Sequence, residues 1–357
     1  MIVLDAHCDS PSQMMRLRDF SLDNAVAQVD FPKMQKGGVN ASFFAAYVPA
    51  SKQGQEATDH AMSLLDILDE QMQKNKDVAA YARCASGVAR NKAAGLISVL
   101  LGLENASAIG HSFDLLKAFY KRGVRYITLT HSADNQVCDS CTGKGTWGGL
   151  SPFGKTLIPE MNRIGMMIDL AHSSDQTMKD VLGLSSKPVA YTHGCCRALA
   201  SHRRNISDEM LRALADNGGV ACMSIYPCFL DDDFLRVLDE SGLESKMWIE
   251  DEFIKDPSDP MKRRAWEEVQ MELCALARPS IARVVDHIEH AVNVAGIEHV
   301  GIGTDYDGIE VTAEGLETIA KFGSLWDEMT RRGFSAKEQN LIAGKNLLRV
   351  LKEVRRR

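Results

Sequence analysis

Six of the short apolar runs in this 357-residue sequence end in, or just before, a side chain that can bind a metal ion or transfer a proton. These residues are His7 with Asp9, Glu104, His131, His172, His193 and Asp305. His7, His172 and His193 with Asp9 and Glu104 give three imidazoles and two carboxylates, the ligand mix typical of Zn²⁺ or a similar divalent ion. Five ligands are more than one tetrahedral metal site can hold, so two metal ions that share one carboxylate are the simplest arrangement.

Each of these signals is weak when it is taken alone. An H-x-D step such as His7-Cys8-Asp9 places both side chains on one face of an extended chain, but it also occurs often by chance. Glu104 needs a partner if it is buried, and a salt bridge would serve as well as a metal ion. A single histidine at the end of a run is more often a hydrogen-bonded core residue. The combination, rather than any one residue, predicts the metal site.

The elements that must position these residues are apolar runs of strand character, each followed by a longer stretch with helical periodicity. Helical stretches include residues 56–76, 112–121, 208–217 and 281–295. Eight strand-helix repeats predict one α/β domain over residues 1–357, a (β/α)8 TIM barrel in which the strand ends meet at one mouth. A doubly wound open sheet is the alternative, but neither G-x-G-x-x-G nor G-x-x-x-x-G-K-[ST] is present. The eight predicted strands are residues 2–7, 39–48, 95–104, 125–131, 165–172, 188–193, 219–226 and 299–305.

Two segments, residues 134–153 and 230–278, do not fit this alternation. The first is rich in Gly, Cys and Ser, and the second is charged and contains Pro257 and Pro260. We expect both to be excursions on the active-site face that shape a pocket.

The composition favours a protein that acts on small molecules. The net charge of −7 is spread along the chain without a basic stripe, so we expect no nucleic-acid partner. The sequence shows neither a signal peptide nor an apolar stretch of the roughly 18 residues needed to span a bilayer, which predicts no membrane association and a cytoplasmic location. The nine cysteines are scattered, as expected for reduced thiols, and Cys138 and Cys141 are interpreted as incidental loop thiols.

Several segments resemble, in the same order, those of the membrane dipeptidase (renal dipeptidase-like) family. They are DAHCDSP, GLEN, RYITLTHSADN, GLSPFGKTLIPEMNRIGMMIDLAHSS, SHRRNISDEML, GIGTDYDG and GKNLLRV. The resemblance covers nearly the whole chain apart from residues 230–278. The first segment departs from the more usual D-G-H-N-D-L-P at Ala6, Cys8 and Ser10, none of which is a predicted ligand.

The resemblance implies a binuclear zinc centre. By position, His7 and Asp9 match the ligands of one zinc ion, His172 and His193 match those of the other, and Glu104 matches the carboxylate that bridges them. A hydroxide held between the two ions would attack the amide bond, because metal coordination lowers the pKa of water toward about 7.

The same resemblance assigns residues that would act on the substrate. His131 matches a residue that contacts the scissile carbonyl, Arg204 matches one that holds the substrate carboxylate, and Asp305 matches the acid/base. From the residues alone, Arg204 would be interpreted as part of a solvated basic turn. Tyr226 could line the pocket or simply pack at the rim, and Asp307 is interpreted as support for Asp305.

The predicted function is therefore hydrolysis of dipeptides, and the family resemblance implies tolerance of a D-residue at the C-terminal position and a homodimer. One alternative is another metal-dependent barrel amidohydrolase, although such enzymes usually begin with H-x-H rather than H-x-D. The other alternative is a binding scaffold without catalysis. Asp169, His287 and His290 are interpreted as structural.

Overall fold

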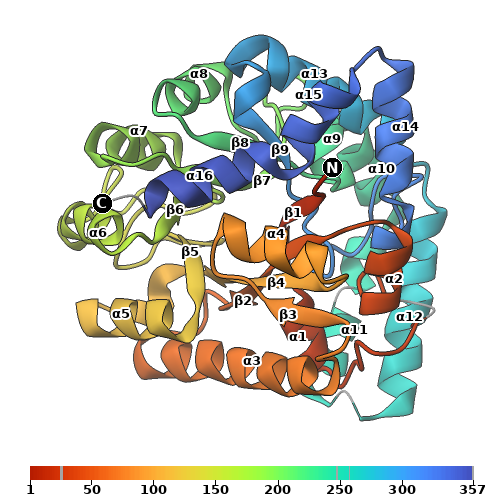
Figure 1. Ribbon diagram of the computed structural model, residues 1–357. Coiled ribbons are helices and arrows are strands. Elements are labelled where there is room, and N and C mark those ends of the chain that lie inside the picture. Colours follow the sequence, from red (N-terminus) through yellow and green to blue (C-terminus); the bar gives the residue numbers. More distant parts are fainter. Residues whose placement is uncertain (25–26, 247, 257, 356–357) are drawn as a thin grey trace.

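The computed structural model describes residues 1–24, 27–246, 248–256 and 258–355, and at its centre a parallel sheet curves into a barrel (Figure 1). Each neighbouring pair along the barrel is parallel. Beyond the last strand, Asp305 N donates to His7 O at 3.1 Å and Asp9 N donates to Tyr306 O at 2.9 Å. These bonds bring the last strand to the first and nearly close the barrel. The strand order is β1 (Leu4–Cys8), β2 (Ala41–Tyr47), β4 (Ile97–Glu104), β5 (Val124–Thr128), β6 (Met167–Asp169), β7 (Ala190–Gly194), β8 (Val220–Met223) and β9 (Val300–Ile302).

The predicted eight-stranded α/β barrel is confirmed, and the open-sheet alternative is wrong. Every predicted strand range contains or overlaps one barrel strand. One further strand, β3 (Ala79–Tyr81), was not predicted; it has three residues and pairs with β4 outside the barrel path.

The strands read as continuous apolar runs because helices cover one face of the sheet and the barrel interior covers the other. All eight residues of β4 are buried. Val99, Leu101 and Leu103 belong to the larger core cluster, whereas Leu100 belongs to the smaller cluster that also contains Tyr126 from β5. The alternation along β4 thus divides its side chains between two cores.

Helices surround the barrel, and the four predicted helical stretches agree with α3, α5, α8 and α13 within two residues. Several begin at serine caps, as where Ser112 Oγ accepts from Leu115 N and Ser207 Oγ accepts from Met210 N. Helix α16 closes one end of the barrel, with Leu347 and Leu351 in the same cluster as Leu100. The helices are α1 (Ser10–Met15), α2 (Phe31–Lys36), α3 (Gly54–Lys74), α4 (Ala85–Ala93), α5 (Phe113–Arg122), α6 (Pro152–Ile164), α7 (Asp175–Leu184), α8 (Asp208–Asp216), α9 (Pro227–Leu230), α10 (Asp232–Ser241), α11 (Trp248–Lys255), α12 (Pro260–Ala275), α13 (Ile281–Ala295), α14 (Gly323–Arg331), α15 (Ala336–Asn340) and α16 (Asn346–Val354).

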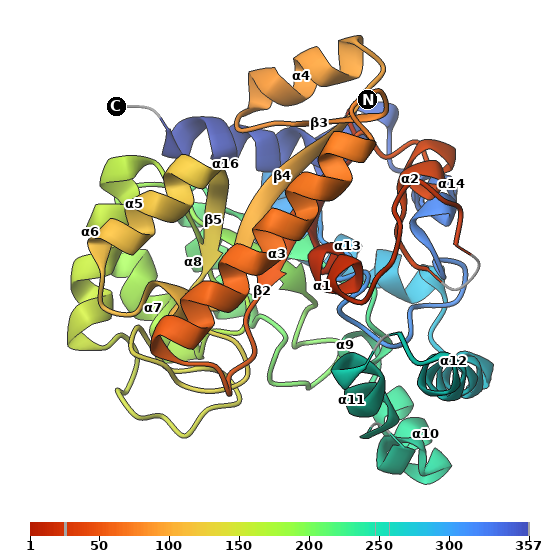
Figure 2. The same cartoon turned by 90° about the horizontal axis from the view of Figure 1, so that it is seen from below.

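The two predicted excursions differ in structure. Residues 230–278 form the helices α10, α11 and α12, which lie at the end of the molecule opposite α4 and α16 (Figure 2). Residues 134–151 form no helix or regular strand and are organised by two carboxylates. Asp134 accepts the N–H groups of Ser140 and Lys144, and Asp139 accepts those of Trp147 and Gly149.

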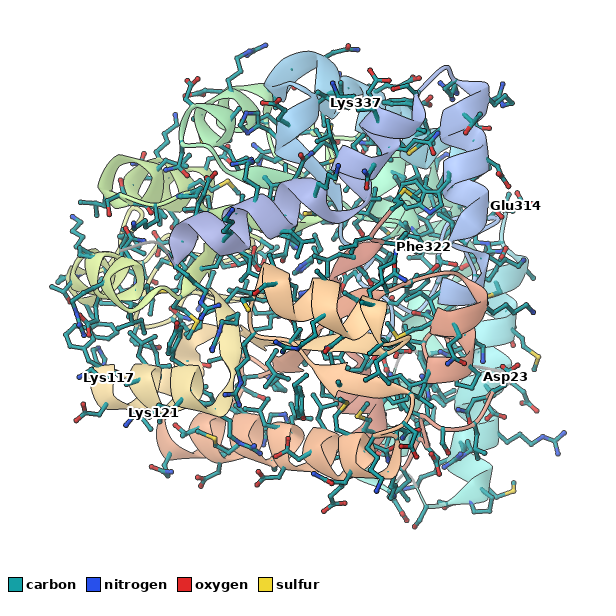
Figure 3. The ribbon with its side chains drawn as sticks, in the orientation of Figure 1. Asp23, Lys117, Lys121, Glu314, Phe322 and Lys337 are labelled. Atoms are coloured by element: carbon teal, nitrogen blue, oxygen red, sulfur yellow. The ribbon has the colours of Figure 1, made fainter. Side chains whose placement is uncertain are left out.

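Charged side chains cover the outside of the molecule. Lys121, Glu314 and Lys337 are exposed at its periphery, whereas Phe322 is buried (Figure 3). No disulfide bond joins any of the nine cysteines, all of which lie in the described part of the chain. In the part of the chain that the structure describes, no helix combines the length and the apolar character needed to cross a membrane.

Candidate metal centre

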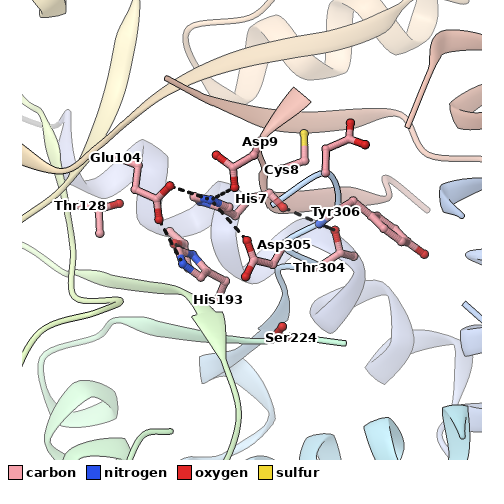
Figure 4. Close-up of polar contacts among 12 residues, drawn as sticks. His7, Cys8, Asp9, Glu104, Thr128, His193, Ser224, Thr304, Asp305 and Tyr306 are labelled. Atoms are coloured by element: carbon pink, nitrogen blue, oxygen red, sulfur yellow. Dashed lines mark hydrogen bonds and ion pairs between the residues drawn. The ribbon is translucent and has the colours of Figure 1, made fainter. Parts of the chain in front are cut away.

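The strand ends bring the predicted ligands together at the mouth of the barrel, on the side of α11 and α12. Figure 4 shows His7, Asp9, Glu104 and His193 among them. His7 lies in β1, and Asp9 directly follows this strand as the residue before α1. Glu104 is the last residue of β4, His193 lies in β7, and His172 follows β6 by three residues. The five side chains are all buried.

Glu104 lies between two groups of ligands. Its Oε2 is 3.5 Å from His7 Nε2, and His7 Nε2 is 3.4 Å from Asp9 Oδ2. Its Oε1 is 3.1 Å from His172 Nε2 and 3.4 Å from His193 Nε2. One carboxylate therefore presents one oxygen to the His7 and Asp9 pair and the other oxygen to the His172 and His193 pair.

The electrostatics of the cluster favour a bound cation. Burial lowers the pKa of His172 and of His193 well below the usual histidine value, so both imidazoles stay neutral and keep a lone pair. Burial alone would lower the pKa of His7, but Glu104 and Asp9 outweigh it and raise that pKa well above its usual value. Burial, then Glu104, raises the pKa of Asp9 to about 6. The carboxylates of Glu104 and Asp9 therefore favour the binding of a positive charge at this place.

Hydrogen bonds on the far side of two imidazoles orient them toward Glu104. His193 Nδ1 lies 2.9 Å from Thr192 Oγ1, and Thr192 Oγ1 donates to Asp169 Oδ2 at 2.7 Å. Because the single hydroxyl proton of Thr192 goes to Asp169, His193 Nδ1 must donate, which puts the lone pair of this ring on Nε2, 2.9 Å from His172 Nε2. His7 Nδ1 lies 2.8 Å from the Tyr126 hydroxyl.

Asp169 itself accepts four hydrogen bonds, two from backbone N–H groups and two from the hydroxyls of Thr128 and Thr192. These bonds agree with the interpretation of Asp169 as a structural residue. Asp169 also connects to His193 through the Thr192 hydroxyl. Tyr126 and Thr192 were not predicted. The sequence offered a signal only for Thr192, a polar residue directly before the predicted ligand His193, because Tyr126 is 119 residues from its partner His7.

The donor set fits a pair of divalent ions. Oδ1 of Asp9 is buried and, among the described residues, has no hydrogen-bond partner, which a cation would satisfy. His172 and Asp305 both have φ of 67°, a conformation that non-glycine residues rarely adopt and that is often kept at functional sites. Gly308 is also required, because a Cβ there would lie 2.1 Å from Asp9 Oδ2.

Three further predicted residues surround the cluster. Asp305 Oδ1 is 3.8 Å from His7 Nε2, and burial, together with Asp9 and Glu104, raises the pKa of Asp305 well above its usual value. The His131 ring lies 4.1 Å from that of His172, and burial lowers the pKa of His131. Its Nδ1 is buried without a partner in the described structure.

Arg204 is buried, whereas the neighbouring Arg203 is exposed. One guanidinium nitrogen of Arg204 donates to His193 O at 3.2 Å, and NH1 has no hydrogen-bond partner among the described residues. The guanidinium lies 5.2 Å from the centre of the Phe229 ring. A fixed cation with an unused donor beside the metal cluster can bind a carboxylate.

The structure places the other interpreted residues as follows. Tyr226 packs edge-on against Phe229 at 4.9 Å, and its hydroxyl donates to Glu310 at 3.3 Å, so it lies behind a cavity residue. The interpretation of Asp307 as support for Asp305 is wrong, because its carboxylate accepts from Ser10 and Arg18, which belong to the chain after β1. His287 and His290 are structural: His287 contacts Cys196 N and Leu230 O, and His290 contacts Asp208.

The ligands open onto a cavity of about 280 Å³. Asp9, Glu104, His131, His172 and Asp305 form its inner wall. Its outer wall is formed by Ser12, Gln13, Arg16, Arg18, Gln28, Tyr47, Glu250, Trp266, Gln270, Asp307, Gly308, Ile309 and Glu310. Helices α11 and α12 contribute three of these residues, which confirms that the excursion 230–278 shapes the pocket.

The excursion 134–153 has a different role. None of the described residues of this segment lines the cavity. Instead, Cys141 N donates to His172 O at 2.8 Å, and Ser140 Oγ donates to His131 O. The loop does not line the cavity itself but holds the backbone of two residues that do, so it shapes the pocket only indirectly.

Comparison with known proteins agrees with this geometry. The family described as membrane dipeptidase (peptidase family M19) matches residues 1–357. The dipeptidase verJ of Clonostachys rogersoniana is 33% identical over 340 residues, which cover 92% of this chain and 76% of that protein. The dipeptidase aclJ of Aspergillus oryzae is 31% identical, with 93% of this chain and 71% of that protein covered.

Solved structures share the fold. The probable dipeptidase PvdM from Pseudomonas aeruginosa superimposes with a TM-score of 0.84 at 22% identity, covering 99% of this chain and 96% of that one. A metallopeptidase from Rhodobacter sphaeroides, liganded with a phosphinate mimic of the dipeptide L-Ala-D-Ala, superimposes with a TM-score of 0.82 at 22% identity, covering 99% of both chains.

A TIM-type barrel with a cluster of metal-binding side chains at the C-terminal ends of its strands defines a metal-dependent hydrolase. The chain belongs to the membrane dipeptidase family, peptidase family M19. It is therefore a dipeptidase that requires a metal ion.

Proposed function

We propose that the chain hydrolyses dipeptides at a centre of two zinc ions, with His7 and Asp9 on one ion, His172 and His193 on the other, and Glu104 on both. The observation that carries the proposal is the division of the Glu104 carboxylate, with one oxygen toward each pair of ligands. The mixture of imidazole and carboxylate donors suits zinc.

When bound, two zinc ions would supply a bridging hydroxide as nucleophile and would polarise the scissile carbonyl. Asp305 takes the proton of the nucleophile and passes it to the leaving amine, a role supported by its position beside the cluster and by its raised pKa. His131 donates from a ring nitrogen to the developing oxyanion and contributes about 3 kcal/mol of transition-state stabilisation.

Arg204 binds the terminal carboxylate of the substrate through its unpaired NH1, which limits the substrate to two residues. Neither this contact nor attack at the carbonyl requires an L-centre in the C-terminal residue. We therefore propose that L-Xaa-D-Xaa dipeptides are also substrates. The Rhodobacter sphaeroides structure with its L-Ala-D-Ala mimic supports this part of the proposal.

The test is to purify the protein, count its metal ions by elemental analysis, and assay L,L and L,D dipeptides beside N- and C-blocked peptides. The proposal expects about two zinc ions per chain and release of free amino acids that stops on chelation. Two ions without hydrolysis of any dipeptide would favour the alternative of another barrel amidohydrolase. Absence of metal binding would contradict the proposed centre.

The single domain, the homodimer and the cytoplasmic location stay predictions.

A further inference from the structure

The outer wall of the cavity contains three carboxylates, Glu250, Asp307 and Glu310. Two of them are paired with a cation: Arg16 contacts Glu250 at 3.0 Å, and Arg18 contacts Asp307 at 2.8 Å. Within the described residues, no ion pair to Glu310 is found, and its side-chain hydrogen bond comes from the neutral Tyr226 hydroxyl at 3.3 Å. Glu310 is thus a cavity carboxylate without a counter-ion from the described part of the chain.

The surroundings of Glu310 make the ionised form of its carboxylate unfavourable. Burial raises the pKa of Glu310, and the nearby Glu250 raises it further. A carboxylate taken partly out of water gains most from a cation that reaches it. The same cavity surface offers Ile309 and Trp266, which can contact the aliphatic part of a long side chain.

A series of contacts connects Glu310 to Arg204. Tyr226 donates to Glu310 and packs edge-on against Phe229, and the Arg204 guanidinium lies over the ring of Phe229. In the proposed function, Arg204 binds the terminal carboxylate of the substrate. We therefore expect the residue that carries that carboxylate to extend its side chain toward Glu310.

We propose that Glu310 determines specificity by binding the cationic side chain of a lysine or arginine at the C-terminal position of the dipeptide. This inference rests on the proposed function and adds to it a class of preferred substrate. A charge-assisted contact of this kind changes kcat/KM by about 10-fold to 100-fold relative to a neutral side chain of similar length.

The experiment compares kcat/KM of the zinc-loaded enzyme for Ala-Lys, Ala-Arg, Ala-Met and Lys-Ala. We expect Ala-Lys and Ala-Arg to exceed Ala-Met by about 10-fold or more, and Glu310→Gln to remove that difference while Ala-Met changes little. Glu314→Gln is the matched control, because Glu314 is exposed, lies four residues further on, and is absent from the cavity wall. Glu310→Lys should reverse the order and favour Ala-Glu.

Three results would overturn the inference. Equal values for Ala-Lys and Ala-Met in the unsubstituted enzyme would show that no cationic subsite operates. An equal loss for all four dipeptides in Glu310→Gln, with unchanged zinc content and circular dichroism, would assign Glu310 to the α-ammonium group that every dipeptide carries. A selective loss for Lys-Ala would place the cation at the N-terminal residue. Failure to hydrolyse any dipeptide would instead reject the proposed function, and this inference with it.

Discussion

The inner and outer walls of the cavity are built in different ways. The inner wall consists of residues at the ends of barrel strands, where backbone pairing and buried hydrogen bonds such as those of Asp169 hold each side chain. The outer wall comes from the chain after β1, from Tyr47 at the end of β2, from the chain after β9, and from α11 and α12, and ion pairs such as Arg16 with Glu250 join some of these parts. We therefore expect the inner wall to set the chemistry and the outer wall to select the substrate.

The largest effect is expected at the carboxylate that the two ligand pairs share. Glu104→Gln keeps the shape of the side chain but removes its charge, so it should lower zinc content from about two ions per chain to one or fewer. We expect kcat/KM for Ala-Ala to fall by about 1000-fold or more. Elemental analysis and the dipeptide assay measure both quantities. Full zinc content with full activity would contradict the role of Glu104.

Asp305→Asn should separate catalysis from metal binding within the inner wall. The amide cannot carry the proton to the leaving amine, so kcat should fall by about 100-fold to 10,000-fold while zinc content and KM change little. Single-turnover and steady-state assays give kcat and KM. Loss of a zinc ion in this variant would make Asp305 a ligand, which its place in a cluster with His7 and Asp9 also permits.

Arg204→Lys tests the proposed contact between Arg204, which bonds to the backbone of His193, and the substrate carboxylate. A lysine keeps the charge but loses the fork that binds a carboxylate through two bonds, so KM for dipeptides should rise by about 10-fold to 100-fold with a smaller change in kcat. A dipeptide amide, which lacks that carboxylate, is the control and should respond little. An unchanged KM for dipeptides would show that Arg204 does not bind the carboxylate.

Two buried aspartates form a matched pair that tests whether hydrogen bonds behind an imidazole strengthen zinc binding. Asp169 and Asp5 each accept from a threonine hydroxyl at 2.7 Å, but only Thr192, the partner of Asp169, also contacts an imidazole nitrogen. Asp169→Asn should therefore weaken zinc binding by about 10-fold to 100-fold, whereas Asp5→Asn should mainly lower the free energy of unfolding. Competition with a chelator and denaturant unfolding measure the two effects. Equal losses of zinc affinity would reject the link through Thr192.

The smallest effect is expected in the outer wall. Glu250→Gln breaks a partly exposed ion pair with Arg16, and such pairs contribute little, so kcat/KM for Ala-Ala should change by no more than about 5-fold at unchanged zinc content. The dipeptide assay and elemental analysis measure this outcome. A loss of more than about 10-fold for this small substrate would mean that the outer wall takes part in the chemistry.

The sequence alone was sufficient to predict the barrel and to bring the predicted ligands to its mouth. Strands buried on both faces require apolar runs, and the mouth of a parallel barrel requires polar residues just after those runs, so both features are local in the sequence. His7, Glu104 and His193 could be found in this way. The helices that follow the strands were equally local, because their periodicity and serine caps lie within a few residues.

Only the tertiary structure decided which side chains support the ligands and which face the substrate. Asp169 acts on His193 through Thr192, which lies 23 residues from Asp169 in the sequence, and Ser10 meets Asp307 across 297 residues. The three-residue strand β3 could not be predicted from the sequence either, because its pairing with β4, and not its composition, makes it a strand. Contacts of this kind depend on how the finished elements pack, and no spacing within the chain encodes them.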